Sequence, residues 1–107
     1  MQLKRGDVVL IYLDPTVGRE IKKTRPCVIV SPDELNEYMA TYIVAPMTTG
    51  SHTYPFRIPC TFKGKDGHII IDQIRTIDEE RIVRVIGKIP EQTLEKVLNA
   101  LQEMFTK

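Results

Sequence analysis

Six short apolar runs separated by turn residues constrain the fold of this chain more than any other feature of its sequence. The runs are residues 7–13, 26–30, 41–47, 55–60, 68–72 and 82–89. Their lengths and their content of Val, Ile and Tyr are typical of β-strands, and the Pro, Gly and Asp residues between them are typical of turns. Pro55 and Pro59 restrict the fourth run to a sheet edge or a bulge, and Gly87 indicates a bulge in the last run. We expect residues 62–67, FKGKDG, to form a turn.

One long helix is expected after Pro90, over residues 91–105. Its apolar side chains recur at helical spacing and predict a stripe that faces a sheet. The stripe consists of Leu94, Val97, Leu98, Leu101, Met104 and Phe105. Shorter helical turns are predicted after Ser31, with the serine as cap and Pro32 at the first position, and at residues 78–81, capped by Asp78.

These elements predict a mainly β protein with a C-terminal helix. The fold class is α+β, with a small, strongly bent antiparallel sheet that forms a half-open barrel. The 107 residues, 42% of them hydrophobic, suit a single domain spanning residues 1–107. A body of this size gains from burying a further face, so a homodimer is expected.

Composition excludes several classes of function. No apolar run reaches the length of a membrane helix, and the N-terminus lacks the apolar core of a signal peptide, so we expect a cytoplasmic protein without a membrane partner. Two Cys and two His without CxxC or HxxxH spacing predict no zinc site, and Cys27 reads as a small buried hydrophobe. A net charge of +1 argues against a broad, sequence-independent nucleic-acid coat. Residues 1–25, however, carry six Lys and Arg against three Asp and Glu, which predicts a local basic patch.

Polar residues at strand ends are the candidates for chemistry, since the sequence has no P-loop, GxSxG or GxGxxG motif. Arg25 directly precedes Pro26 and an apolar strand, where it is either a solvated strand end or a fixed charge aimed at an anion. Thr48 follows the third strand and is either a turn residue or a site residue. Asp72 lies beside a buried strand and belongs either to a structural network with backbone amides or to a ligand site.

Three segments in order along the chain carry a resemblance to a known family. They are residues 5–32 (RGDVVLIYLDPTVGREIKKTRPCVIVSP), 43–50 (IVAPMTTG) and 72–78 (DQIRTID). With the C-terminal helix, they resemble the MazF/PemK (Kid) toxins of type II toxin–antitoxin systems over almost the whole chain. The resemblance implies an SH3-like barrel, a homodimer and a metal-independent endoribonuclease without a cofactor. Such an enzyme cleaves single-stranded RNA, including mRNA, at short sequence motifs.

The resemblance also implies partners and catalytic residues. A MazE-like antitoxin would silence the enzyme by placing an acidic, disordered tail in the basic groove, and contact with operator DNA would be only indirect, through that antitoxin. The family's catalytic arginine and threonine correspond to Arg25 and Thr48, and Thr49 replaces Thr48 if the strand ends one residue later. Glu20, in the basic loop, is a further candidate as general base or as a residue that orients Arg25.

The residue types suit this chemistry. The 2′-hydroxyl of RNA attacks the neighbouring phosphorus, which leaves a 2′,3′-cyclic phosphate and a 5′-hydroxyl. A guanidinium and a hydroxyl stabilise the negative charge that the transition state gathers on phosphoryl oxygens. Arginine stays protonated throughout the neutral range and is therefore a poor general base.

The loops at residues 14–23 and 48–54 are expected to line the RNA groove, because single-stranded RNA is recognised through its unpaired bases. The predicted RNA-binding residues are Thr16, Arg19, Lys22, Lys23, Thr49, His52, Tyr54, Gln73 and Arg75. The plasmid-encoded branch of the family often has a histidine at the position of Arg19 and an arginine at that of Ile70.

Two other functions are compatible with a barrel of this kind. A non-catalytic toxin of the same fold poisons DNA gyrase, but those toxins rely on a tryptophan-containing C-terminus, and this chain has no Trp. An inert SH3-like binding module is the third alternative, against which Arg25, Thr48 and the DQIRTID segment argue.

Overall fold

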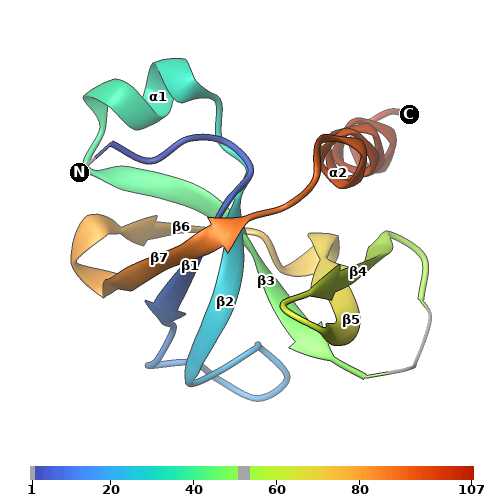
Figure 1. The fold of residues 1–107 in the computed structure, drawn as a ribbon, viewed down its shortest axis with the longest axis horizontal. Coiled ribbons are helices and arrows are strands. Elements are labelled where there is room, and N and C mark those ends of the chain that lie inside the picture. The colour runs from blue at the N-terminus through green and yellow to red at the C-terminus, as the bar shows by residue number, and fades with distance from the viewer. Residues whose placement is uncertain (1, 51–53) are drawn as a thin grey trace.

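The structure is a computed structural model that describes residues 2–50 and 54–107. Figure 1 shows a bent sheet with a helix at each side of it. The elements are β1 (Asp7–Tyr12), β2 (Thr24–Ile29), α1 (Asp33–Tyr38), β3 (Thr41–Thr49), β4 (Arg57–Phe62), β5 (Lys65–Ile70), the 3₁₀ turn η1 (Ile71–Gln73), β6 (Arg75–Asp78), the 3₁₀ turn η2 (Glu79–Arg81), β7 (Ile82–Lys88) and α2 (Glu91–Met104). The predicted mainly β fold with a C-terminal helix is confirmed.

Strand β3 is the centre of the sheet. The strand order is β4-β5-β3-β2-β1-β7, and β6 also pairs with β3. All pairings are antiparallel, and β3 divides one of its edges between β6, which pairs with its first half, and β5, which pairs with its last three residues. The sheet bends into the predicted half-open barrel. The barrel does not close, because β4 and β7, the strands at the two ends of the order, are not hydrogen-bonded to each other.

The central strands β1, β2 and β3 bury side chains on both of their faces. Alternation of side chains along β2 and β3 sends Cys27 and Val44 into the barrel interior, and Val28 and Ala45 to the outer face. Each face has its own apolar cluster. The strands are therefore continuous apolar runs, which is the pattern that the sequence displays.

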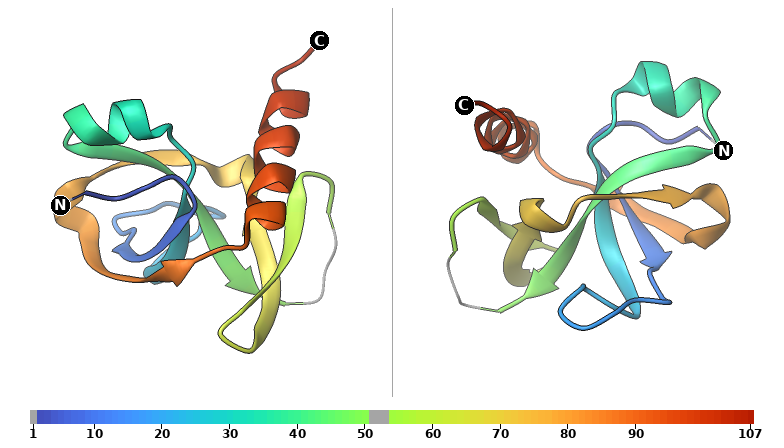
Figure 2. Two further views of the ribbon diagram at one scale, coloured as in Figure 1. Left: turned by 45° about the horizontal axis from the view of Figure 1, so that its top comes forward. Right: turned by 180° about the vertical axis from the view of Figure 1, so that it is seen from behind.

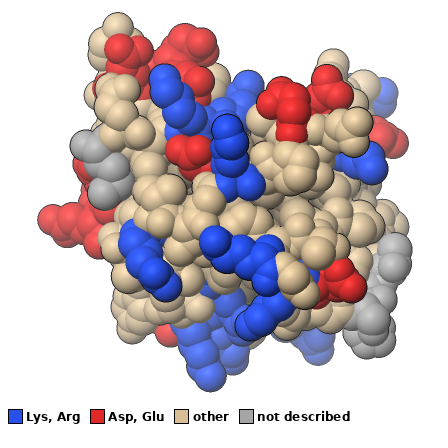
Figure 3. Space-filling model, in the orientation of Figure 1, with Lys and Arg blue, Asp and Glu red and all other residues tan. Residues whose placement is uncertain are grey.

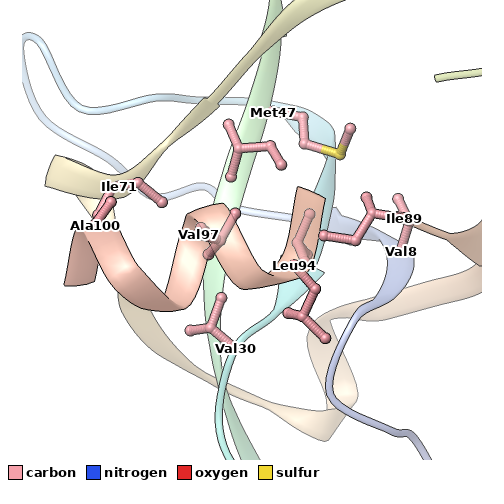
Figure 4. Close-up of a cluster of buried hydrophobic side chains, with 11 residues drawn as sticks. Val8, Val30, Met47, Ile71, Ile89, Leu94, Val97 and Ala100 are labelled. Carbon is pink, nitrogen blue, oxygen red and sulfur yellow. The ribbon is translucent and has the colours of Figure 1, made fainter. Parts of the chain in front are cut away.

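Helix α2 covers the outer cluster. Figure 4 shows Leu94, Val97 and Ala100 of α2 pointing at side chains of the sheet, including Val30 and Met47. Burying a side chain of the size of Leu or Val stabilises a fold by about 1.5–3 kcal/mol. Figure 2 shows α2 on the side of the β4–β5 hairpin, away from α1. The expected stripe was too long by one residue, because the helix ends at Met104 and the Phe105 side chain is 74% exposed.

Three strand boundaries differ from the sequence prediction in ways that affect the site. β3 continues to Thr49, so Thr48 lies within a strand rather than in the loop after it. The expected turn at residues 62–67 is only the pair Lys63 and Gly64, whose φ angles of 50° and 78° suit a two-residue hairpin turn. Strand β6 was missed, because it follows η1 after the end of β5.

Some of the smaller predictions are confirmed, and the predicted cap of α1 is wrong. Pro59 does lie in an edge strand, and the register between β1 and β7 shifts near Gly87, as a bulge requires. Asp78 caps η2 by accepting a hydrogen bond from the backbone of Glu80 at 2.8 Å. The predicted cap of α1 was wrong, because the Ser31 hydroxyl instead donates to Asn36 Oδ1 at 2.5 Å. Within residues 2–50 and 54–107, no helix has the length and apolar character needed to cross a bilayer.

Candidate functional site

Arg25 and Thr48 lie on neighbouring strands at one end of the sheet. Cys27 of β2 pairs with Pro46 of β3, and Arg25 and Thr48 lie two positions further along their strands, on the same face. Both line a hollow of about 470 Å³ between these strand ends and the β4–β5 hairpin. We call this hollow the strand-end groove. The structure therefore brings together the two residues that the sequence named as catalytic.

The guanidinium of Arg25 is largely uncommitted. Its Nε donates to the carbonyl oxygen of Lys22 at 3.1 Å, which fixes the direction of the side chain. Among the described residues, no carboxylate lies within 4.0 Å of it, and its other N–H groups have no hydrogen-bond partner. A half-buried, oriented guanidinium with free N–H groups is suited to an anionic ligand.

The strand-end groove is basic. Arg25, Lys63 and Lys65 line it against one carboxylate, Asp66, which already accepts a hydrogen bond from the Thr61 hydroxyl at 2.5 Å. Figure 3 shows Lys and Arg side chains gathered at the lower edge of the view, where Figure 1 has the β1–β2 loop and the end of β3. Most Asp and Glu side chains lie toward the top and the left of that face. This charge distribution favours a phosphate over a cation.

Thr48 has a histidine directly opposite it. In the pairing of β3 with β5, Thr48 is the partner of His68, so the two side chains share a face of the sheet. Thr48, Thr49 and His68 also line a second hollow of about 280 Å³ with Tyr54, which we call the tyrosine pocket. His68 was missed as a site residue, since its approach to Thr48 depends on a register between strands that are distant in sequence.

Gly67 allows this close approach of β5 to β3. A Cβ atom on Gly67 would lie 1.9 Å from the carbonyl oxygen of Thr48. Only glycine fits there without a shift of one strand.

Glu20 lies in a different hollow. With Arg19, Gln73 and Arg75, it lines a space of about 670 Å³ under the β1–β2 loop, which we call the loop pocket. Its carboxylate accepts a hydrogen bond from the backbone N–H of Val17 at 2.7 Å. Glu20 does not line the strand-end groove, and its role as a base stays a prediction.

The DQIRTID segment holds the β1–β2 loop in place. Gln73 accepts from the backbone N–H of Ile21 at 2.7 Å and donates to the carbonyl of Arg19 at 3.2 Å. Arg75 donates to the carbonyl of Leu13 at 3.1 Å. Both side chains therefore make structural contacts within the chain, in addition to the RNA contacts predicted for them.

Asp72 forms an ion pair with Arg57. The two N–H···O contacts measure 3.0 and 3.1 Å, which is the bidentate geometry of a strong guanidinium–carboxylate pair. Hydrogen bonding to Arg57 lowers the pKa of Asp72 below its ordinary value, and the same contact raises the pKa of Arg57. The guanidinium carbon of Arg57 also lies 4.8 Å from the centre of the Tyr54 ring, at the wall of the tyrosine pocket.

Most of the remaining predicted RNA-binding residues lie in loops, and Thr49 is the last residue of β3. The Thr16 hydroxyl donates to Asp14 at 2.7 Å within the β1–β2 loop, where Lys22 and Lys23 are exposed. Thr49 is exposed at the end of β3, between the strand-end groove and the tyrosine pocket. His52 lies outside the described residues.

Metal-ligand clusters and reactive thiols are not features of the described part of the chain. There, no three His, Cys, Asp or Glu side chains are grouped so that they could hold a metal ion. Burial raises the pKa of the Cys27 thiol to about 12, so Cys27 is neither a thiolate nucleophile nor a thiolate ligand at neutral pH.

Comparison with known proteins supplies a family and a fold. Residues 4–105 match the family described as the PemK-like, MazF-like toxin of type II toxin–antitoxin systems. The chain is 36% identical over 105 residues to the endoribonuclease MazF of Staphylococcus epidermidis, which covers 92% of this chain and 88% of that protein.

Solved structures share the fold. A crystal structure of MazF from Deinococcus radiodurans superposes with a TM-score of 0.86 at 24% identity, covering 97% of this chain and 96% of the other. An endoribonuclease in complex with its cognate antitoxin, from a mycobacterial species, superposes with a TM-score of 0.79 at 22% identity, covering 94% and 92%.

Proposed function

This chain belongs to the PemK-like, MazF-like toxin family of type II toxin–antitoxin systems, and from that premise we propose that it is an endoribonuclease acting at the strand-end groove. The observation that carries the proposal is the convergence of Arg25 and Thr48 in one basic groove. Its substrate is single-stranded RNA, above all mRNA, which it meets in the cytoplasm. Relatives of this chain carry the same activity in their names.

The groove suits the transesterification of RNA. Negative charge grows on the phosphoryl oxygens as the 2′-oxygen attacks, and the free N–H groups of Arg25 and the hydroxyl of Thr48 are donors held on strands that do not need to reorganise. Lys63 and Lys65 add positive charge to the same groove. We infer products with a 2′,3′-cyclic phosphate and a 5′-hydroxyl, formed without a metal ion, because these side chains supply the charge stabilisation that a metal would otherwise provide.

The neighbouring hollows suit the nucleotides on either side of the cleaved bond. Tyr54 offers a ring for base stacking in the tyrosine pocket, while Arg19 in the loop pocket and Lys22 and Lys23 on the adjoining loop offer charge to backbone phosphates. Glu20 orders the loop that leads to Arg25, through its hydrogen bond to Val17.

The protein is proposed to act as a homodimer that a MazE-like antitoxin neutralises. A solved complex of an endoribonuclease with its cognate antitoxin supports the type of partner. An acidic antitoxin segment complements the basic strand-end groove and competes there with RNA. Any link to operator DNA runs through the antitoxin.

Cleavage of a long, mixed-sequence single-stranded RNA in EDTA tests the proposal. We expect discrete cuts on primer extension and fragments that end in cyclic phosphate and 5′-hydroxyl. Arg25→Ala and Thr48→Val should each lower the cleavage rate by about 100-fold or more, the usual effect of removing a preorganised donor. Arg84→Ala removes an exposed cation on β7 outside the three hollows and is the matched control, expected to keep the wild-type rate.

Two results would contradict this proposal. A folded wild-type protein that leaves the RNA intact would exclude endoribonuclease activity. Cleavage that depends on added Mg²⁺, or that survives both Arg25→Ala and Thr48→Val, would exclude a metal-independent mechanism at the strand-end groove.

A further inference from the structure

We propose that His68 is the general base of the cleavage reaction, an inference that rests on the proposed ribonuclease function. Arg25 and Thr48 are proposed as hydrogen-bond donors, but neither can take the proton from the 2′-hydroxyl, since arginine and threonine are both poor bases at neutral pH. Histidine is the side chain whose neutral form accepts a proton in this range.

The register places His68 beside the reacting phosphate. His68 is directly opposite Thr48, and directly opposite residues of an antiparallel pair have Cβ atoms about 4.5–5.5 Å apart. Arg25 lies on the other side of Thr48, across the strand-end groove, which His68 also lines. A phosphate held by the Thr48 hydroxyl therefore has Arg25 on one flank and His68 on the other.

This arrangement matches the geometry of in-line attack. The 2′-oxygen and the departing 5′-oxygen lie on opposite sides of the phosphorus, so the two proton-transfer groups must flank the phosphate from opposite directions. The 2′-oxygen–phosphorus bond forms as the phosphorus–5′-oxygen bond breaks. His68 takes the proton of the 2′-hydroxyl, and the 5′-oxygen takes a proton delivered by the guanidinium of Arg25. Arg25 then regains a proton from solvent and His68 releases one to it, so the enzyme returns to its starting state and no proton is gained or lost overall.

The other candidate bases are engaged or placed elsewhere. Asp66 lines the strand-end groove, but its carboxylate already accepts a hydrogen bond from the Thr61 hydroxyl at 2.5 Å. Glu20 lines the loop pocket and not the strand-end groove. Within the described residues, no side chain or backbone group is hydrogen-bonded to the imidazole of His68. The ring is half-buried beside Thr48 and remains free to accept a proton from a substrate.

Single-turnover cleavage by His68→Gln and His68→Asn tests the role. Both variants should cleave a normal RNA about 100-fold or more slowly, as expected for the loss of general base catalysis. Both should still bind, within about twofold of the wild-type affinity, an RNA that carries a 2′-deoxy sugar at the cut site. Two different replacements are used so that a folding defect of one variant is not mistaken for the loss of the base.

A substrate with sulfur in place of the bridging 5′-oxygen separates a base from an acid. The thiolate leaves without protonation, so the loss in the His68 variants should persist on this substrate if His68 acts on the 2′-hydroxyl. A loss that disappears there would show that His68 is the acid, and would overturn the assignment. A loss explained by weaker RNA binding would overturn it as well.

Two controls keep this inference distinct from the proposed function. Arg84→Ala, at an exposed position on β7 outside the three hollows, should keep the wild-type rate. Wild-type protein that cleaves RNA while both His68 variants cleave equally fast would refute the role of His68 alone. Wild-type protein without cleavage would refute the ribonuclease function itself.

Discussion

Replacing Gly67 with alanine should disable the site without removing any side chain that is proposed to meet the substrate. The added Cβ would lie 1.9 Å from the Thr48 carbonyl oxygen, whereas Cβ contacts under 3.0 Å essentially do not occur, so β3 and β5 must separate by about 1 Å. Crowding of this kind costs about 1–3 kcal/mol of folding free energy. A displacement of about 1 Å at catalytic groups lowers a rate by about 100-fold.

The matched control is Gly64→Ala in the same hairpin. Gly64 has no atom within 4 Å of its added Cβ, and its φ of 78° costs a non-glycine residue about 1–2 kcal/mol. The two variants should therefore unfold at similarly reduced urea concentrations, but only Gly67→Ala should lose cleavage and hydrogen-exchange protection of the β3–β5 amides. Cleavage at the wild-type rate by Gly67→Ala, with these amides still protected, would refute the argument that the close approach positions Thr48 and His68.

Two further predictions concern the DQIRTID segment. Gln73→Ala removes two hydrogen bonds to the β1–β2 loop and should lower the free energy of unfolding by about 1–2 kcal/mol. It should also speed amide hydrogen exchange at Ile21, and unchanged exchange there would show that the loop does not depend on Gln73. Asp72→Asn should lower the free energy of unfolding at pH 7 by less than about 1 kcal/mol, because the pair with Arg57 is partly exposed. Since that pair lowers the folded pKa of Asp72, its contribution is complete above the ordinary value of 3.8 and is lost as the pH falls through the lowered value. Urea unfolding of wild type and Asp72→Asn should therefore differ at pH 7 and converge well below pH 3.8, and a gap that widens in acid would contradict the assignment.

Local pattern in the sequence predicts the buried strands and the helix, because their apolar periodicity follows directly from what they bury. The same reasoning fails for the β4–β5 hairpin and for β6. The hairpin lies at the sheet edge and exposes Lys63, Lys65 and Asp66, so its composition reads as a turn. In β6 only Ile77 is buried, and its strand character comes from backbone pairing with β3. Neither signal is present in a local window of residues.

The residues of the candidate site could likewise be predicted only in part from the sequence. Arg25 and Thr48 were identified from the motifs that resemble a family, and the register of β2 with β3 places them on one face. His68 was not identified, although a two-residue turn at Lys63 and Gly64 would have fixed its partner in β4. Its position opposite Thr48 depends on how β5 meets β3, which is set by contacts between segments about 20 residues apart in the chain.

The position of the site follows from the way β3 is shared. β2 pairs with β3 only as far as Cys27 and Pro46, so the last residues of β3 have β5 on one side and an opening on the other. The strand-end groove is that opening, and the β1–β2 loop leads Arg25 into it. Gln73 and Arg75 tie this loop to the barrel, while Gly67 sets the distance between Thr48 and β5. The two flanks of the proposed phosphate site are thus positioned by separate contacts, so each can be displaced by mutation while the other stays in place.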